Sequence, residues 1–276
     1  MKRVLPLLLL LLATTALARE FWLAPAQFWV VPGAAVYLRR LVGDNFAGTP
    51  WPGRSARLTA FRHYAPGQPP ADLLTAAGPV ADTIRSTVTL GQPGTHLVAL
   101  QTDYALVTLP ADQFTAYLHE QGFGYALAQR AQRGQTAAPG REAYRRCATT
   151  LVQAGAYAAT DTARAWGRPA GLALELVPEQ NPYGLRPGAA LTVRVLAAGQ
   201  PVAGLLVRLW QRGARGPVLL GKLHSNQNGR VLLHLPTAGS YLISCVEMAS
   251  APAASAAHWH STWSTLTFGI ADKERP

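Results

Sequence analysis

The chain has 276 residues, with 25 lysine and arginine residues against 14 aspartate and glutamate residues, and a formal net charge of +11. Because it has only two cysteines, it is not a small disulfide-rich scaffold. Its length is typical of about two domains, each able to bury a core. After the first 18 residues no stretch reaches the length of about 20 apolar residues that a membrane span needs. We therefore expect no transmembrane segment in the mature chain.

The first 18 residues have the composition of a secretory signal peptide. Lys2 and Arg3 precede a short run of leucines, and the segment ends in Ala16-Leu17-Ala18. A basic start, an apolar run and small residues at the end are typical of a segment that is removed on export. We expect cleavage before Arg19 and a periplasmic or secreted protein. Outside the cytoplasm, the excess of arginine has two interpretations, a solvated helix face or contact with an anionic envelope surface, and we expect no nucleic-acid partner.

Two sets of strand patterns follow, separated by a helical region. The patterns are apolar or alternating, and Gly, Pro and Asp residues punctuate them. Strands are predicted at residues 35–42, 57–64, 85–90, 95–101 and 104–109, and again at 172–177, 191–196, 205–210, 218–224, 230–235, 241–247 and 263–270.

Two helices are predicted between these sets of strands. In the first, Phe114, Tyr117 and Leu118 share one face. In the second, at residues 141–155, apolar side chains recur at spacings of three and four and would form one stripe on a helix: Tyr144, Cys147, Ala148, Leu151 and Val152. We expect a loop rich in Gly, Gln and Pro to join the two helices.

The two β halves share short sequences in the same order. Residues 23–27 (LAPAQ) match 176–180 (LVPEQ), and 32–39 (PGAAVYLR) match 187–194 (PGAALTVR). Residues 93–98 and 238–243 are a third match. Pro-Gly before a strand is common in any sandwich, but three ordered matches favour tandem copies of one unit.

The sequence thus predicts a mainly β fold of two tandem immunoglobulin-like β-sandwich domains with a two-helix insert between them. We expect the sandwiches at residues 19–110 and 171–270. The helical insert and linker would occupy 111–170, and a tail would occupy 271–276.

No catalytic motif is evident in the sequence. His119-Glu120 lacks the second histidine of a zinc-protease motif, and the chain has no GxSxG elbow, no phosphate-binding glycine loop and no CxxC pair. We therefore predict a protein that is not an enzyme. Cys147 and Cys245 lie in apolar patterns, and we expect two buried thiols, although export would permit a disulfide.

Metal binding is the one chemistry for which the sequence offers candidate residues. His258 and His260 are two positions apart, so in an extended chain both imidazoles would point to one side, with their Cα atoms about 6.6–7 Å apart. Imidazole suits nickel, copper and zinc. We predict His258 and His260 as metal ligands. The alternative is a pair of solvated histidines in a loop rich in Ala and Ser.

Several motifs, taken in order, resemble a bacterial family of exported proteins of unknown function, often labelled as the periplasmic component of nickel or cobalt uptake. The motifs are Glu20-Phe-Trp-Leu23, Phe114-x-x-Tyr-Leu-x-Glu-x-Gly122, Gly140-Arg-Glu-x-Tyr144, Gly171-Leu-x-Leu-Glu-Leu-Val-Pro178, Asn228-Gly-Arg230 and Trp263-x-Thr-Leu-Thr-Phe268. The resemblance implies two β-sandwich domains with a helical insert, export, and a role around transition-metal ions.

Two functions from different classes are left open by these observations. The first is a periplasmic accessory or binding protein without catalytic activity, associated with nickel, cobalt or copper and with the membrane proteins of a metal-uptake system. The second is an envelope module that binds a protein or a glycan and has no metal role.

Overall fold

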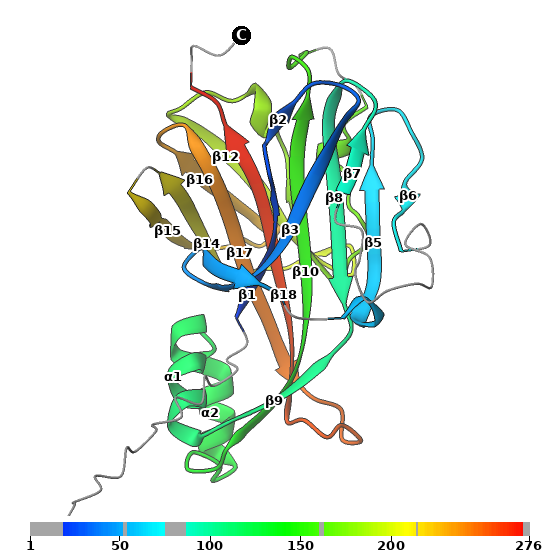
Figure 1. Ribbon diagram of the computed structural model, residues 1–276. Helices are drawn as coiled ribbons and strands as arrows, with labels where there is room; N and C mark the ends of the chain where they lie inside the picture. The colour runs from blue at the N-terminus through cyan, green and yellow to red at the C-terminus, as the bar shows by residue number, and fades with distance from the viewer. Residues whose placement is uncertain (1–18, 52–53, 75–86, 160–162, 214, 273–276) are drawn as a thin grey trace, which may run out of the picture.

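The computed structural model describes residues 19–51, 54–74, 87–159, 163–213 and 215–272 (Figure 1). The expected signal peptide lies outside the described residues. The strands are β1 (Glu20–Pro25), β2 (Trp29–Val30), β3 (Ala34–Asp44), β4 (Ala47–Pro50), β5 (Leu58–Tyr64), β6 (Ala71–Asp72), β7 (Thr87–Leu90), β8 (Gly94–Thr102), β9 (Ala105–Leu109), β10 (Gly140–Ala154), β11 (Leu174–Pro178), β12 (Ala189–Ala197), β13 (Gln200–Pro201), β14 (Leu206–Gly213), β15 (Gly216–His224), β16 (Arg230–Leu235), β17 (Gly239–Ser250) and β18 (Trp259–Ile270).

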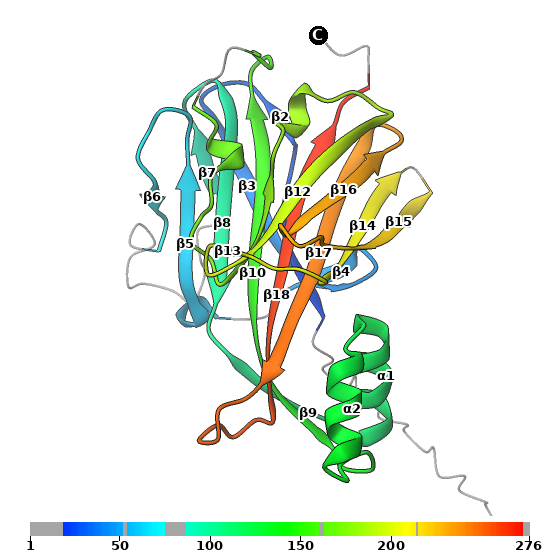
Figure 2. The same ribbon diagram turned by 180° about the vertical axis from the view of Figure 1, so that it is seen from behind.

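The two α-helices are α1 (Ala111–Gln121) and α2 (Gly124–Gln132), and they follow one another between β9 and β10. Neither of them is long and apolar enough to cross a lipid bilayer. In both views the helices lie beyond one end of the large sheet (Figures 1 and 2). The mainly β fold with a two-helix insert is therefore confirmed.

One sheet of ten strands takes strands from both halves of the chain. Its order is β15-β14-β17-β18-β10-β8-β5-β6, and β2 and β9 also pair with β10. At the centre, β10 and β18 run parallel, in a register from Glu142 opposite Trp259 to Thr150 opposite Thr267. A continuous ladder of backbone hydrogen bonds thus connects the two halves. The division into sandwiches at 19–110 and 171–270 stays a prediction.

Two small sheets cover opposite faces of the large one, which gives each half its sandwich. Leu97 and Cys147 pack with residues of β11, β12 and β16, whereas their neighbours Val98 and Ala148 pack with residues of β1, β3 and β7. Successive side chains of a strand point to opposite faces. The view in Figure 1 accordingly has β3 in front of the large sheet, and the reverse view in Figure 2 has β12 in front.

The pairing of the small sheets confirms the internal repeat. β3 pairs with β1, β4 and β7, and β12 pairs in the same way with β11, β13 and β16. Val36 lies opposite Val88, and Leu191 lies opposite Leu233. The preceding glycines, residues 33 and 188, adopt φ angles of 87° and 88°, and each donates its N–H to the last residue of the partner strand at 2.7 Å. Glycine suits these positions because it tolerates positive φ.

The predicted helix at residues 141–155 is wrong, because this segment forms strand β10 (Gly140–Ala154). The stripe that suggested a helix divides between two faces. Cys147 and Leu151 belong to one core, and Ala148 and Val152 belong to the other. A spacing of four fits a period of 3.6 and also a period of two. Since β10 is buried on both faces, no alternation of polar and apolar residues reveals the strand.

The second helix, α2, lies in the segment that was expected to be a loop. Its sequence, GYALAQRAQ, consists mainly of good helix formers, but it buries only Ala126 and Arg130 and so has no apolar stripe. The first helix buries Phe114, Tyr117 and Leu118, as predicted. Gly140, at the start of β10, lets α1 pack against this strand, because a Cβ atom at this position would lie 2.1 Å from the Phe114 ring.

The two cysteines are buried free thiols, as expected. They occupy one row of the large sheet, where Ser264 of β18 lies between them, paired with Cys147 on one side and Cys245 on the other. Two interstrand spacings place the two Cα atoms about 9.5 Å apart, beyond the limit of about 7 Å for a disulfide. Burial raises the pKa of both thiols, to about 11 for Cys147, which makes them poor nucleophiles.

We therefore expect the folded protein to withhold both thiols from a thiol reagent such as Ellman's reagent, and the denatured protein to expose both. The thermal midpoint should be the same with and without a reductant. A reductant-sensitive midpoint, or a mass lower by two hydrogens under non-reducing conditions, would contradict the placement of β18 between the cysteines.

Candidate functional site

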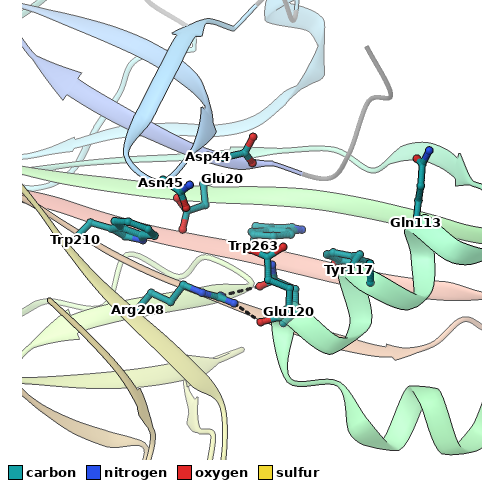
Figure 3. Close-up of a pocket in the computed structure, with 11 residues that line it drawn as sticks. Glu20, Asp44, Asn45, Gln113, Tyr117, Glu120, Arg208, Trp210 and Trp263 are labelled. Carbon is teal, nitrogen blue, oxygen red and sulfur yellow. Dashed lines mark hydrogen bonds between the residues drawn. The ribbon is translucent and has the colours of Figure 1, made fainter. Parts of the chain in front are cut away.

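A pocket of about 240 Å³ lies where α1 approaches the large sheet (Figure 3). Its walls come from the start of β1, the end of β3, one side of α1, and strands β14 and β18. The lining residues are Glu20, Asp44, Asn45, Gln113, Ala116, Tyr117, Glu120, Gln121, Arg208, Trp210 and Trp263. Both halves of the chain and the helical insert thus contribute to one site.

The position of α1 at the pocket follows from how the helix ends. Gly122 adopts the left-handed conformation, and hydrogen bonds from the N–H groups of Gly122 and Phe123 to His119 and Leu118 close the last turn. The remaining carbonyl groups at this end need donors and carry partial negative charge. Arg208 of β14 supplies such donors.

The guanidinium of Arg208 fastens the end of α1 to the sheet. It donates to the carbonyl oxygen of Glu120 at 2.6 Å and to Oε1 of Gln121 at 2.7 Å, as Figure 3 shows. The side chain is buried, with 5% of its residue surface exposed. A buried cation is tolerated when it is paired in this way. The charge of Arg208 therefore serves mainly to hold the helix.

Four residues that line the pocket carry a buried polar atom with no hydrogen-bond partner among the described residues. These atoms are Oε2 of Glu20, Oε1 of Gln113 and the indole Nε1 atoms of Trp210 and Trp263. An unsatisfied buried polar group costs about 1–3 kcal/mol, and such groups in a native protein call for an explanation such as an absent water or ion. A cavity lined by such groups can hold water or a ligand.

Glu20 is the most unusual of the lining residues. It is 7% exposed, and its Oε1 accepts a hydrogen bond from the Ser244 hydroxyl. Burial raises the pKa of this carboxyl group, while the Ser244 hydrogen bond and the nearby Arg208 oppose that effect. Glu20 is therefore a buried carboxyl group that a ligand could ionise by supplying a partner.

A second buried carboxyl group lies behind the pocket. Oε1 of Glu142 accepts hydrogen bonds from the Tyr117 hydroxyl, at 3.2 Å, and from the Ser261 hydroxyl. Oε2 of Glu142 has no partner in the described part of the chain. Because Glu142 is fully buried, its pKa is raised to about 7, against the effect of these two hydrogen bonds. Tyr117 thus lines the pocket and also bonds to a group that titrates near neutral pH.

The two histidines predicted as metal ligands lie away from this pocket, at the start of β18. Nε2 of His258 accepts a hydrogen bond from Nη2 of Arg141 at 2.8 Å. His260 contacts the Ser255 hydroxyl at 3.1 Å and the ring of Tyr104. The guanidinium of Arg141 occupies the Nε2 lone pair of His258, to which a metal ion would have to bind. Burial lowers the pKa of His258, and the charge of Arg141 lowers it further.

No group of three or more His, Cys, Asp or Glu side chains is placed to hold a metal ion within the described residues. A site normally needs about four ligands, and two imidazoles beside an arginine do not fit that requirement. His258 and His260 as metal ligands therefore remain a prediction from the sequence.

Sequence reasoning gave no role to the residues that form the pocket. Glu20, Glu120 and Trp263 entered it only as parts of motifs, Tyr117 also as part of a helix face, and Arg208 only as a position in the predicted strand at 205–210. One available signal was the scarcity of acidic residues, 14 in a chain of net charge +11. This signal would have directed attention to Glu20, although it does not reveal which residues meet.

The buried Glu142 gives a prediction about stability. The unfolded carboxyl group titrates near its ordinary pKa of 4.5, and the folded one near 7. The folded state therefore holds this proton more tightly than the unfolded state does. The contribution of Glu142 to the free energy of unfolding is fully present below about pH 4.5, and it falls by roughly 3 kcal/mol as the pH rises to about 7. The variant Glu142→Gln stays neutral and should not show this loss.

Urea unfolding of the wild type and of Glu142→Gln between about pH 4 and pH 8 measures the effect. The difference in unfolding free energy should shift in favour of the variant between about pH 4.5 and pH 7, and should stay constant above that range. Parallel pH profiles for the two proteins would show that Glu142 is not buried in this way.

Comparison with known proteins identifies a family. The sequence matches the model of a family described as "Domain of unknown function (DUF4198)" over residues 16–248. No curated protein matches the sequence. The match confirms the resemblance to a family of unknown function, and the nickel and cobalt label stays a prediction.

Several solved structures are similar at a low level. The D0-D1 domain of Intimin has 10% identity and a TM-score of 0.19, with 90% of this chain and 97% of that chain covered. Escherichia coli alpha-2-macroglobulin activated by porcine elastase has 11% identity and a TM-score of 0.24, with 93% and 20% covered. Three N-terminal domains of the bacteriophage RB49 Highly Immunogenic Outer Capsid protein have 11% identity and a TM-score of 0.20, with 91% and 59% covered. These values are too low to suggest a function. Because the family model covers most of the sequence, the chain belongs to the DUF4198 family, whose function is unknown.

Proposed function

We propose that this protein is an exported binding protein without catalytic activity, and that it holds a small molecule in the pocket beside α1. The observation that carries the proposal is the set of four pocket-lining residues, Glu20, Gln113, Trp210 and Trp263, whose buried polar atoms lack partners in the described part of the chain. A ligand that satisfied them would recover part of the free energy that their burial costs.

The chemistry of the lining residues favours binding over catalysis. Among the described residues that line the pocket there is no Ser, Thr, Cys, Lys or His that could act as a nucleophile beside a base. Its arginine is occupied by the end of α1. The lining instead offers aromatic surface and a few polar groups, which is typical of small-molecule sites.

Export is proposed from residues 1–18, by their basic start and apolar run. Mass spectrometry of the protein isolated from its native host should give Arg19 as the first residue. Detection of Met1 on the main species outside the cytoplasm would contradict cleavage at this position.

A thermal-shift screen tests the pocket. The panel contains amines, sugars, amino acids, organic acids and the ions of nickel, cobalt, copper and zinc. A ligand present at about a hundred times its Kd stabilises the folded protein by about 2.7 kcal/mol. The variant Ala116→Phe places a ring in the pocket from an exposed position of α1 and should abolish this shift.

The matched control is Ala131→Phe, the same substitution at an exposed position of α2 that does not line the pocket. It should respond to the ligand as the wild type does. The proposal fails when no compound stabilises the wild type, or when Ala116→Phe responds equally. A metal shift that disappears in a His258→Ala/His260→Ala variant would favour the metal-handling function over this one.

A further inference from the structure

We infer that the ligand of this pocket is an organic cation, a protonated amine or a quaternary ammonium compound; this inference rests on the proposed function and names its ligand class. The first observation is the distribution of charge. The chain has 14 acidic residues and a net charge of +11, yet three of the acidic residues line this one cavity. They are Glu20, Asp44 and Glu120.

Against these three carboxyl groups the lining contains one cation, Arg208, whose charge acts on Glu20. Arg208 is bound to Gln121 and to the main chain of Glu120 at the end of α1. Asp44 forms an ion pair with Arg19 at 3.2 Å, but both side chains are about half exposed, and such surface pairs are weak. No ion pair to Glu20 or Glu120 occurs in the described part of the chain.

Glu20 is the observation that points to a ligand independently of the acidic cluster. Its carboxyl group is nine-tenths buried, and Oε2 accepts no hydrogen bond from the residues that the structure describes. In Figure 3 the Glu20 side chain extends toward the space between Trp210 and Trp263. Four groups act on it: Ser244 of β17, Arg208 of β14, Asp44 of β3 and the backbone N–H of Phe46. A positive group in the pocket would lie beside this buried carboxyl group and would favour its ionised form.

The walls of the cavity are suited to a cation with an organic surface. Trp210, Trp263 and Tyr117 line it, and the rings of Tyr117 and Trp263 are stacked at 6.2 Å. Aromatic faces attract ammonium groups, most strongly when the cation loses its water. The carboxyl groups do not converge into a metal-binding group among the described residues. The volume of about 240 Å³ therefore fits a small molecule and not a bare ion.

Isothermal titration calorimetry on the processed protein tests this inference with three probes. Choline and putrescine are the cations, and neohexanol is the neutral carbon isostere of choline. We expect choline or putrescine to bind, and neohexanol to bind at least about tenfold more weakly than choline, because it lacks the charge that Glu20 and the aromatic rings attract.

Two variants and a control assign the effect to the carboxyl groups. Glu120→Gln removes an exposed charge and should weaken binding by about threefold. Glu20→Gln should weaken it more and should also remove the pH dependence, since binding of a cation to the wild type strengthens as Glu20 ionises. Asp112→Asn removes an acid from the same helix outside the pocket and should leave the affinity unchanged.

The outcomes separate this inference from the proposed function. Equal binding of choline and neohexanol, or no binding of either ammonium probe, overturns the organic cation. When another class of compound then stabilises the wild type but not Ala116→Phe, the proposed binding function stands. Failure of every class overturns both.

Discussion

The parallel pairing of β10 with β18 is the constraint on which the rest of the structure depends. Each is the last strand of its half, and their register extends over nine residue pairs, from Glu142 to Thr150. This ladder makes one ten-stranded sheet from two similar halves. Parallel strands are typically covered on both faces. Here each half covers one face, with β1, β3 and β7 on one side and β11, β12 and β16 on the other.

The same pairing explains why the pocket includes residues of both halves. β10 begins at Gly140, well before it meets β8 at residues 151–154, and its first residues pair with β9 and β18. The β9–β10 connection therefore carries α1 to the end of the large sheet. There α1 meets β14 and β18 of the second half, and Arg208 caps it. On the same face, Trp22 and Phe46 of the first half pack on Trp210 of the second.

The pocket residues are not an arrangement that stability alone would favour. Replacing a buried, partnerless polar group by an apolar one of similar shape is often neutral or stabilising. Glu20 and the indoles of Trp210 and Trp263 all retain such groups around one cavity. Arg208 and the close contact of Phe114 with Gly140 hold α1 over that cavity. Hydrogen bonds and close packing next to the cavity thus hold in place residues whose own polar atoms lack hydrogen-bond partners, as expected for a preorganised binding site.

Local sequence was sufficient for strands such as β3 and β12 and for the repeat, because their patterns and turns depend on neighbouring residues. Alternating or β-branched runs and the glycines at residues 33 and 188 predicted β3 and β12 and their equivalence. The burial of Phe114, Tyr117 and Leu118 also followed from their spacing on α1. The separation of the two thiols could not be predicted from local spacing, since it depends on β18 lying between β10 and β17.

Only the tertiary structure decided β10 and the pocket. The spacing of Cys147 and Leu151 fits a helix and a strand equally, and the choice came from partners on both sides that lie far away in the chain. Glu20, Glu120, Arg208 and Trp263 belong to four elements, and no local pattern records that they meet. Periodicity and turn chemistry act over a few residues and were readable from the sequence. Strand order, and with it the site, depends on contacts between residues far apart in the chain, such as Arg208 and Glu120, which are 88 positions apart.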